Sequence, residues 1–105
     1  MDKLKKITGL FKALSDENRL KIVDFIRKNE IKCSLNDKGK CKDKTCINDL
    51  GKYLKIGLPT VSHHVKELTR AEILITEKSG RWSYLRINPK RIAEITDFLN
   101  LFIIN

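Results

Sequence analysis

The strongest constraint on the fold is a pair of short amphipathic segments separated by a tight turn. In "CINDLGKYLKI", Leu50 and Leu54 lie four residues apart, the spacing of one helical face, and Asn48 is suited to cap that helix. "GLP" then forms a turn, and Pro59 has the fixed φ that favours the first position of a second helix. Two short helices joined in this way are typical of a helix-turn-helix, here over residues 48–72.

The second of these helices has one apolar and one polar side. At about 100° per residue, Val61, Val65 and Leu68 fall together, so we expect them to point into the core. The opposite side carries side chains of the kinds that contact DNA, since lysine and arginine bind phosphate or guanine and short polar groups reach base edges. These residues are Thr60, Ser62, His63, Lys66 and Arg70. An ordinary solvated helix face is the alternative.

The same helix contains two adjacent histidines, His63 and His64. Neighbouring residues of a helix do not face each other, and a metal shared by two histidines on a helix needs them four residues apart. We therefore expect no joint metal site. His63 falls on the polar side, whereas His64 falls at the edge of the apolar stripe, as a satisfied boundary residue or a phosphate contact.

The segment "ILITEKSGRWSYLRI", residues 73–87, has the pattern of a β-hairpin with Ser79 and Gly80 as its turn. A two-residue loop there predicts three facing pairs: Ile75 with Tyr84, Leu74 with Leu85, and Lys78 with Arg81. Facing cations are mildly destabilising, so Lys78 and Arg81 favour a nearby anion such as the DNA backbone. A cationic hairpin beside a helix-turn-helix is the wing of a winged helix. Trp82 and Tyr84 are expected to be packing residues.

Helices are also predicted at both ends of the chain. A helix over residues 2–14 has the apolar stripe Leu4, Ile7, Leu10, Phe11 and Leu14. Ser15 or Asp16 can cap a second helix that runs to about Lys28, with Leu20, Val23 and Ile26 on its apolar face. A last helix over residues 89–105 has the stripe Ile92, Ile95, Leu99, Phe102 and Ile103. We expect a stripe this apolar to pack against another surface.

Residues 29–45 break the helical pattern. They are polar and cationic, contain cysteine, and predict a long loop with at most one short strand. Loops of this length within a domain are usually functional or mobile. The length of 105 residues is that of one ordinary domain, so we take residues 1–105 as a single unit.

The charge balance is strongly basic, with 22 lysines and arginines against 13 acids and a net charge of +9. Such a domain favours nucleic acid as a partner, with an anionic membrane surface as the rival. Because no window of 18 residues is apolar throughout, we expect no membrane-spanning helix. Of the two possible partners we favour nucleic acid, and so expect no membrane partner. The N-terminal segment reads as a helix rather than a signal peptide, which predicts a cytoplasmic protein.

Taken together, the order of these elements resembles the ArsR/SmtB family of winged-helix repressors over nearly the whole chain. Three stretches carry the resemblance: "LFKALSDENRLKIVDFI" (10–26), "CINDLGKYLKIGLPTVSHHVKELTRAEIL" (46–74) and "KSGRWSYLRI" (78–87). It implies a mostly α winged helix-turn-helix with a β-hairpin wing. It also implies a homodimer built on the first and last helices, which binds a double-stranded, imperfectly palindromic operator until an inducer releases it.

In the family pattern, a serine and a histidine recur in the second helix of the helix-turn-helix, at the positions of Ser62 and His64. The helical wheel favours His63 instead, so both histidines are kept. The candidate DNA-binding residues are Thr60, Ser62, His63, His64, Lys66, Arg70, Lys78 and Arg81.

Metals and metalloids are frequent inducers in this family. One family site uses two cysteines in a "CVCDL"-like stretch, where this chain has "CINDL" and so retains Cys46 but carries Asn48 in place of the second cysteine. Another site uses Asp and His on the last helix. That helix has Glu94 and Asp97 but no histidine, so we do not expect the second site here.

Cys33, Cys41 and Cys46 are candidate metal ligands. Three thiolates would suit arsenite or another thiophilic metal ion, and with a fourth ligand they would suit zinc. The lysines between them favour the thiolate form. A thiol redox switch and inert thiols are the alternatives.

Other classes of function are less well supported by the sequence. There is no Gly-rich phosphate loop, no HExxH motif and no clear pair of catalytic carboxylates, so we do not expect an enzyme. A winged helix that binds protein or RNA, without a dimer or an operator, is the other alternative.

Overall fold

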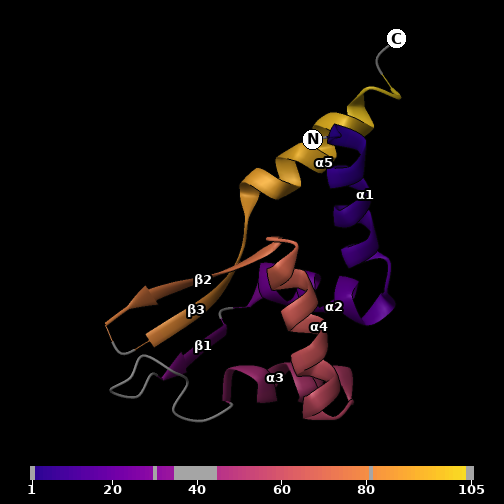
Figure 1. The fold of residues 1–105 in the computed structure, drawn as a ribbon. Coiled ribbons are helices and arrows are strands. Elements are labelled where there is room, and N and C mark those ends of the chain that lie inside the picture. The colour runs from indigo at the N-terminus through magenta and orange to yellow at the C-terminus, as the bar shows by residue number, and fades with distance from the viewer. Residues whose placement is uncertain (1, 30, 35–44, 81, 104–105) are drawn as a thin grey trace.

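Five helices and three strands make up the computed structural model, which describes residues 2–29, 31–34, 45–80 and 82–103. In chain order they are α1 (Lys3–Leu14), α2 (Glu17–Lys28), β1 (Ile31–Ser34), α3 (Thr45–Leu54), α4 (Leu58–Arg70), β2 (Leu74–Ser79), β3 (Trp82–Ile87) and α5 (Pro89–Asn100). Figure 1 shows α1 and α5 together at one end, α3 and α4 towards the other, and the β2–β3 hairpin projecting to the side. The predicted fold class, mostly α with a β-hairpin wing, is confirmed.

Side-chain caps explain where three helices begin. The Asp2 carboxylate accepts a hydrogen bond from Leu4 N at 3.0 Å, and Asn88 accepts one from Lys90 N at 3.2 Å. Of the two residues predicted to cap α2, Asp16 has this role, since its Oδ1 accepts from Asn18 N at 2.8 Å and from Arg19 N at 3.2 Å.

The predicted start of α3 at Asn48 is wrong, because the helix already begins at Thr45. The reason is Ile47, which is partly buried against the core and extends the apolar face of Leu50 and Leu54 upstream at helical spacing. Asn48 therefore lies inside the helix rather than at its cap.

The turn between α3 and α4 is tight. Lys55 has a φ of +59°, and the amides of Lys55 and Ile56 both donate to Gly51 O, at 2.8 and 3.3 Å. The two helices are close here, since a Cβ on Gly51 would lie 3.2 Å from Leu58 Cδ2. Pro59 occupies the second position of α4 rather than the first, because the helix begins at Leu58.

The core lies where α2, α3, α4 and β2 meet. Its largest fully buried side chains are Ile22, Leu50, Val61, Leu68, Ile73 and Leu74. The predicted inward face of α4 is confirmed for Val61 and Leu68, and Val65 is half-buried.

The predicted apolar face of α2 is wrong in part. Of the three predicted residues, Ile26 is buried and Val23 is half-buried, whereas Leu20 is 53% exposed. Ile22, which was not predicted, is fully buried. Leu20 lies two residues from Ile22, which is about 200° around a helix, so the two cannot share a buried face.

The three strands form one antiparallel sheet in the order β1-β3-β2. The short strand expected within the long loop is present as β1, where Ile31 pairs with Leu85. In the part of the chain that the structure describes, no helix is long and apolar enough to cross a membrane.

The predicted register of the hairpin is wrong by two residues. Lys78 pairs with Ser83 rather than with Arg81, and Leu74 pairs with Ile87. The turn lies one residue later than expected, since β2 includes Ser79 and Gly80 takes a left-handed φ of +60° directly after it. A shift of two residues leaves each side chain on its predicted face. It removes the inferred repulsion between facing cations, and Arg81 itself lies outside the described residues.

The helices α1 and α5 pack together but leave apolar side chains uncovered. Phe11 and Phe98 are in edge contact, with ring centroids 6.1 Å apart. Phe98 makes a second edge contact with Phe102, with ring centroids 5.2 Å apart. The exposed apolar side chains of these helices and of the turn after α5 are Leu4, Phe11, Leu99, Leu101, Phe102 and Ile103.

The left-handed backbone at Lys55 gives a test of the turn. Because glycine adopts positive φ without the Cβ clash, Lys55→Gly is expected to raise the free energy of unfolding by about 1 kcal/mol. Lys52→Gly is the matched control, since Lys52 lies within α3 and glycine there should lower it by about 1 kcal/mol. Urea denaturation of both variants measures the difference, and a loss of stability in both would contradict the proposed turn.

Candidate nucleic-acid interface

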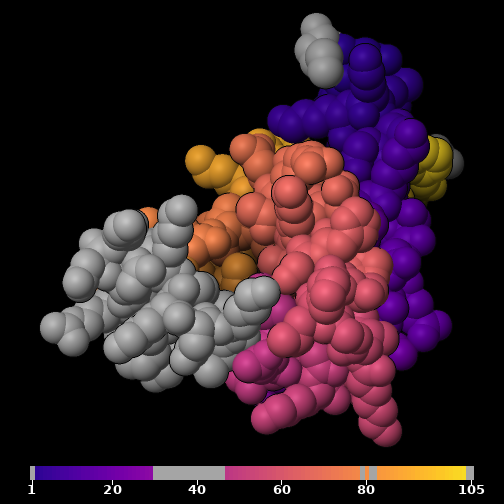
Figure 2. Space-filling view, turned by 60° about the horizontal axis from the view of Figure 1, so that its bottom comes forward, coloured from indigo at the N-terminus to yellow at the C-terminus, as the bar shows by residue number. Residues whose placement is uncertain are grey.

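The outer side of α4 is open to solvent. Thr60, His63, Lys66 and Arg70 are exposed and Ser62 is half-buried, so five of the residues predicted to contact DNA share one side of the helix. In Figure 2 the α4 segment occupies the middle of the face turned to the viewer, with α1 along one side. Within the described residues, the fold leaves this side uncovered.

The two cations of this surface differ in their surroundings. Arg70 Nη1 lies 3.0 Å from Glu67 Oε1 on the same helix, so part of its charge is neutralised. Among the ion pairs of the described residues, none includes Lys66. Lys66 is therefore better placed than Arg70 to bind an external anion.

His64 does not lie on the exposed side. It is only 7% exposed, and its Nδ1 accepts a hydrogen bond from Arg19 Nε at 3.1 Å. That bond requires the proton of a neutral imidazole to be on Nε2, which lies 4.0 Å from Asp16 Oδ1. Arg19 also donates to Ala13 O at 3.5 Å, so His64 connects α4 to the junction of α1 and α2.

The two histidines therefore diverge, as the helical wheel indicates. Their ring centroids are 5.8 Å apart, with His63 exposed and His64 turned inward. The burial of His64 follows from its place on the Val61–Leu68 side of the helix. What sequence reasoning missed is its partner, because Arg19 is 45 positions away and no local pattern connects the two.

The hairpin presents cations on both of its strands. Lys78 is exposed on β2. On β3, the Arg86 guanidinium lies 4.9 Å from the centre of the Tyr84 ring and 3.6 Å from Glu77 Oε1. Arg86 was missed in the sequence, although its alternation with Tyr84 along a strand is a signal that they share a face.

The cysteines are only partly described. Cys33 lies in β1, where its backbone pairs with Ser83, and Cys46 lies in the first turn of α3. These two elements pack against each other, whereas Cys41 lies outside the described residues. Within the described residues there is no group of three or more His, Cys, Asp or Glu side chains that would hold a metal ion.

Comparison with known proteins adds relatives along nearly the whole chain. The chain is 34% identical over 95 residues to an uncharacterized HTH-type transcriptional regulator of Methanocaldococcus jannaschii, covering 90% of this chain and 92% of that protein. It is 31% identical over 101 residues to an arsenical resistance operon repressor of Staphylococcus xylosus, covering 96% of this chain and 82% of that protein. No family model matches the chain.

A solved structure supports the same fold. The homodimeric winged helix-turn-helix DNA-binding domain Mb0332 of Mycobacterium bovis superposes with a TM-score of 0.62 at 18% identity, over 95% of this chain and 80% of that one. At this level of identity the likeness shows the fold alone.

The buried position of His64 predicts different effects for the two histidines. His64→Ala leaves the Arg19 donor without its partner and should lower the free energy of unfolding by about 1–3 kcal/mol. His63→Ala, at an exposed position, should change it by no more than about 0.5 kcal/mol. Chemical denaturation of the two variants tests this, and equal effects would show that the His64–Arg19 bond contributes nothing.

Proposed function

The chain belongs to the ArsR/SmtB family of winged-helix transcriptional repressors, and on this premise we propose that it represses transcription in the cytoplasm by binding operator DNA as a homodimer. The observation that carries the proposal is the uncovered outer side of α4, which presents short polar groups and a lysine. A net charge of +9 supplies the long-range attraction to DNA.

Different residues are proposed to have different roles on the DNA. Thr60, Ser62 and His63 are near the start of α4 and are proposed to contact base edges in the major groove. Lys66 and Arg70 are proposed to bind phosphate or guanine.

The wing is proposed to bind the phosphate backbone. Lys78 is exposed on β2. Arg81 is also proposed to bind the phosphate backbone, and it lies outside the described residues. His64 is proposed to hold α4 against α2 through its hydrogen bond with Arg19, rather than to contact a base.

A homodimer is supported by the uncovered apolar side chains on α1, α5 and the turn after α5. Exposed clusters of this kind, such as the one that includes Phe11, Leu99 and Phe102, usually mark an interface. Two-fold symmetry through α1 and α5 would make the interface self-complementary. The two α4 helices would then enter successive major grooves about 34 Å apart.

Selection of bound duplexes from a random pool tests the operator proposal. The expected product is a pseudo-palindrome, and Ser62→Ala or His63→Ala should change the preferred bases at a cost of about 1–3 kcal/mol for each good contact. Lys78→Ala should instead weaken binding to all sequences and reduce the slope of affinity against salt by about one.

Two results would contradict the proposal. One is a selected pool without two-fold symmetry, and the other is a sequence preference that neither Ser62→Ala nor His63→Ala alters. A protein that sediments as a monomer and binds duplexes of any sequence equally would instead favour the alternative, a winged helix that binds protein or RNA.

The packing of β1 on α3 favours a second element of the function, release by a thiophilic ion. It brings the strand that carries Cys33 beside the helix that carries Cys46, and α3 also approaches α4 closely at Gly51. We propose that Cys33, Cys41 and Cys46 bind arsenite or another thiophilic metal ion, or zinc with a fourth ligand. Binding there would move α3 and thereby disturb α4.

Titration of the reduced protein with arsenite, Cd²⁺ and Zn²⁺ tests this second element. Thiolate-to-metal absorption should appear, and operator affinity should fall by about tenfold or more, equivalent to about 1.4 kcal/mol. Cys46→Ser should remove both responses. If affinity falls only after oxidation, the thiols act as a redox switch, and if no treatment changes it, they are inert.

A further inference from the structure

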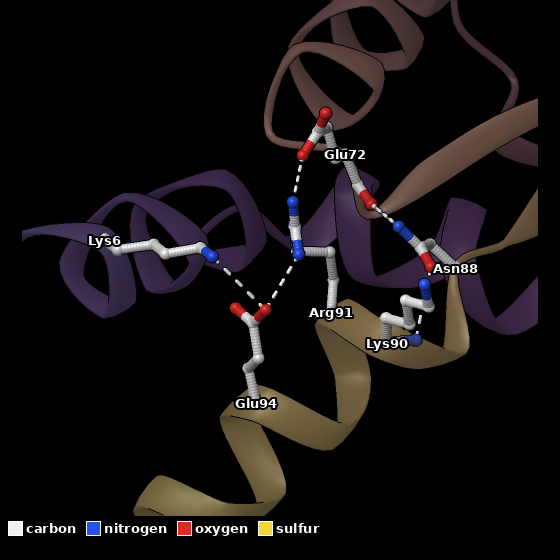
Figure 3. A network of polar contacts seen from close by, with 6 residues as sticks. All are labelled: Lys6, Glu72, Asn88, Lys90, Arg91 and Glu94. Carbon is white, nitrogen blue, oxygen red and sulfur yellow. Dashed lines mark hydrogen bonds and ion pairs between the residues drawn. The ribbon is translucent and has the colours of Figure 1, made fainter. Parts of the chain in front are cut away.

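The start of α5 is bonded to the residue pair that follows α4. Glu72 leaves the helix with a φ of +61°, and its carbonyl accepts a hydrogen bond from Asn88 Nδ2 at 2.9 Å. The backbone amide of Asn88, the cap of α5, donates to Ile73 O at 2.8 Å. Two bonds that do not depend on charge thus hold the end of α4 to the beginning of α5, and Figure 3 shows the one between Asn88 and Glu72.

Arg91 adds a charged connection at the same place. Its Nη2 donates to Glu72 Oε2, and its Nη1 donates to Glu94 Oε1 at 2.8 Å. Lys6 on α1 reaches the same oxygen of Glu94 at 3.3 Å. One guanidinium therefore links the end of α4 to α5 and, through Glu94, to α1, as Figure 3 shows.

The surroundings of Arg91 favour a well-ordered guanidinium that keeps its bonds to Glu72 and Glu94. Its side chain is only 20% exposed, and the hydrogen bond that it donates to Glu72 is the main reason that the pKa of the guanidinium lies above its usual value. A planar guanidinium can bridge two carboxylates at fixed angles, which a lysine cannot do. By contrast, the elements that lie closest along α4 are α1, α2, α3 and β2.

We propose that Arg91 is a positioning residue that sets the angle between α5 and the end of α4, and so determines how strictly the dimer discriminates the spacing between operator half-sites. This inference rests on the proposed function, because it needs a dimer that joins two reading helices. One inserted base pair moves a half-site by about 3.4 Å and rotates it by roughly 35°. A stiff connection cannot follow that change, whereas a loosened one can.

Arg91→Gln and Glu72→Gln in the full chain test the role. Each protein is titrated with the duplex selected by the unmodified protein and with duplexes carrying one base pair more or fewer between half-sites. The ratio of affinities for correct and altered spacing should fall by about tenfold in either variant. In the double variant this ratio should fall no further than in Arg91→Gln alone, since Arg91→Gln already removes the bond to Glu72.

Glu17→Gln is the matched control. It makes the same chemical change in another ion pair, Glu17 with Lys21 at 3.0 Å within α2, and should leave the spacing ratio unchanged. Sedimentation and thermal unfolding test whether each variant is a folded dimer. Glu72 is 59% exposed, so Glu72→Gln is expected to fold even if Arg91→Gln does not.

The outcomes separate this inference from the proposed function. Strict spacing in the unmodified protein and in both folded variants overturns the role of Arg91 and leaves the operator proposal standing. An equal loss of affinity at every spacing also overturns it, since that is the result of a merely structural role. An unmodified protein without any spacing preference overturns both proposals.

Discussion

The arrangement of this molecule depends on the burial of one edge of α4. Val61 and Leu68 are fully buried, and each side chain of this size contributes about 1.5–3 kcal/mol when removed from water. Because a helix has a fixed period, burying that edge also exposes the opposite one. The same packing that stabilises the domain therefore presents Ser62, His63 and Lys66 outward, without any interaction that serves only their exposure.

Much of this was predictable because the signals are local. The outer side of α4 follows from helical spacing within residues 59–72, and the cap of α2 follows from Asp16 just before the helix. The wing was recognisable from alternating residues around Gly80. Each of these features depends on neighbours in the chain, which is the information that a single sequence contains most directly.

The features that sequence reasoning missed depend on distant residues or on small offsets. His64 receives its hydrogen bond from Arg19, 45 positions away, and Arg91 meets Glu72 across 19 positions. The hairpin register depends on whether Gly80 is the first or the second residue of a two-residue loop. Both positions fit the same alternation of apolar and polar residues along the two strands. On α2, Leu20 and Ile22 are both apolar, so only the packing of neighbouring helices decides which is buried.

The distribution of ion pairs adds an electrostatic reason for the proposed interface. Among the described residues, carboxylates neutralise cations within α2, at the end of α4, on the hairpin and between α1 and α5. A cation that already has an internal partner gains less from a phosphate, because it must share or exchange that partner. Lys66, in the middle of the open side of α4, has no such partner among these pairs. Other described lysines on α1, α3, β2 and α5 also lack a carboxylate partner, so free positive charge is not confined to one face. Lys66 is the one that lies on the side of α4 that helical packing leaves uncovered, which makes it the unpaired cation best placed for a duplex that α4 would enter.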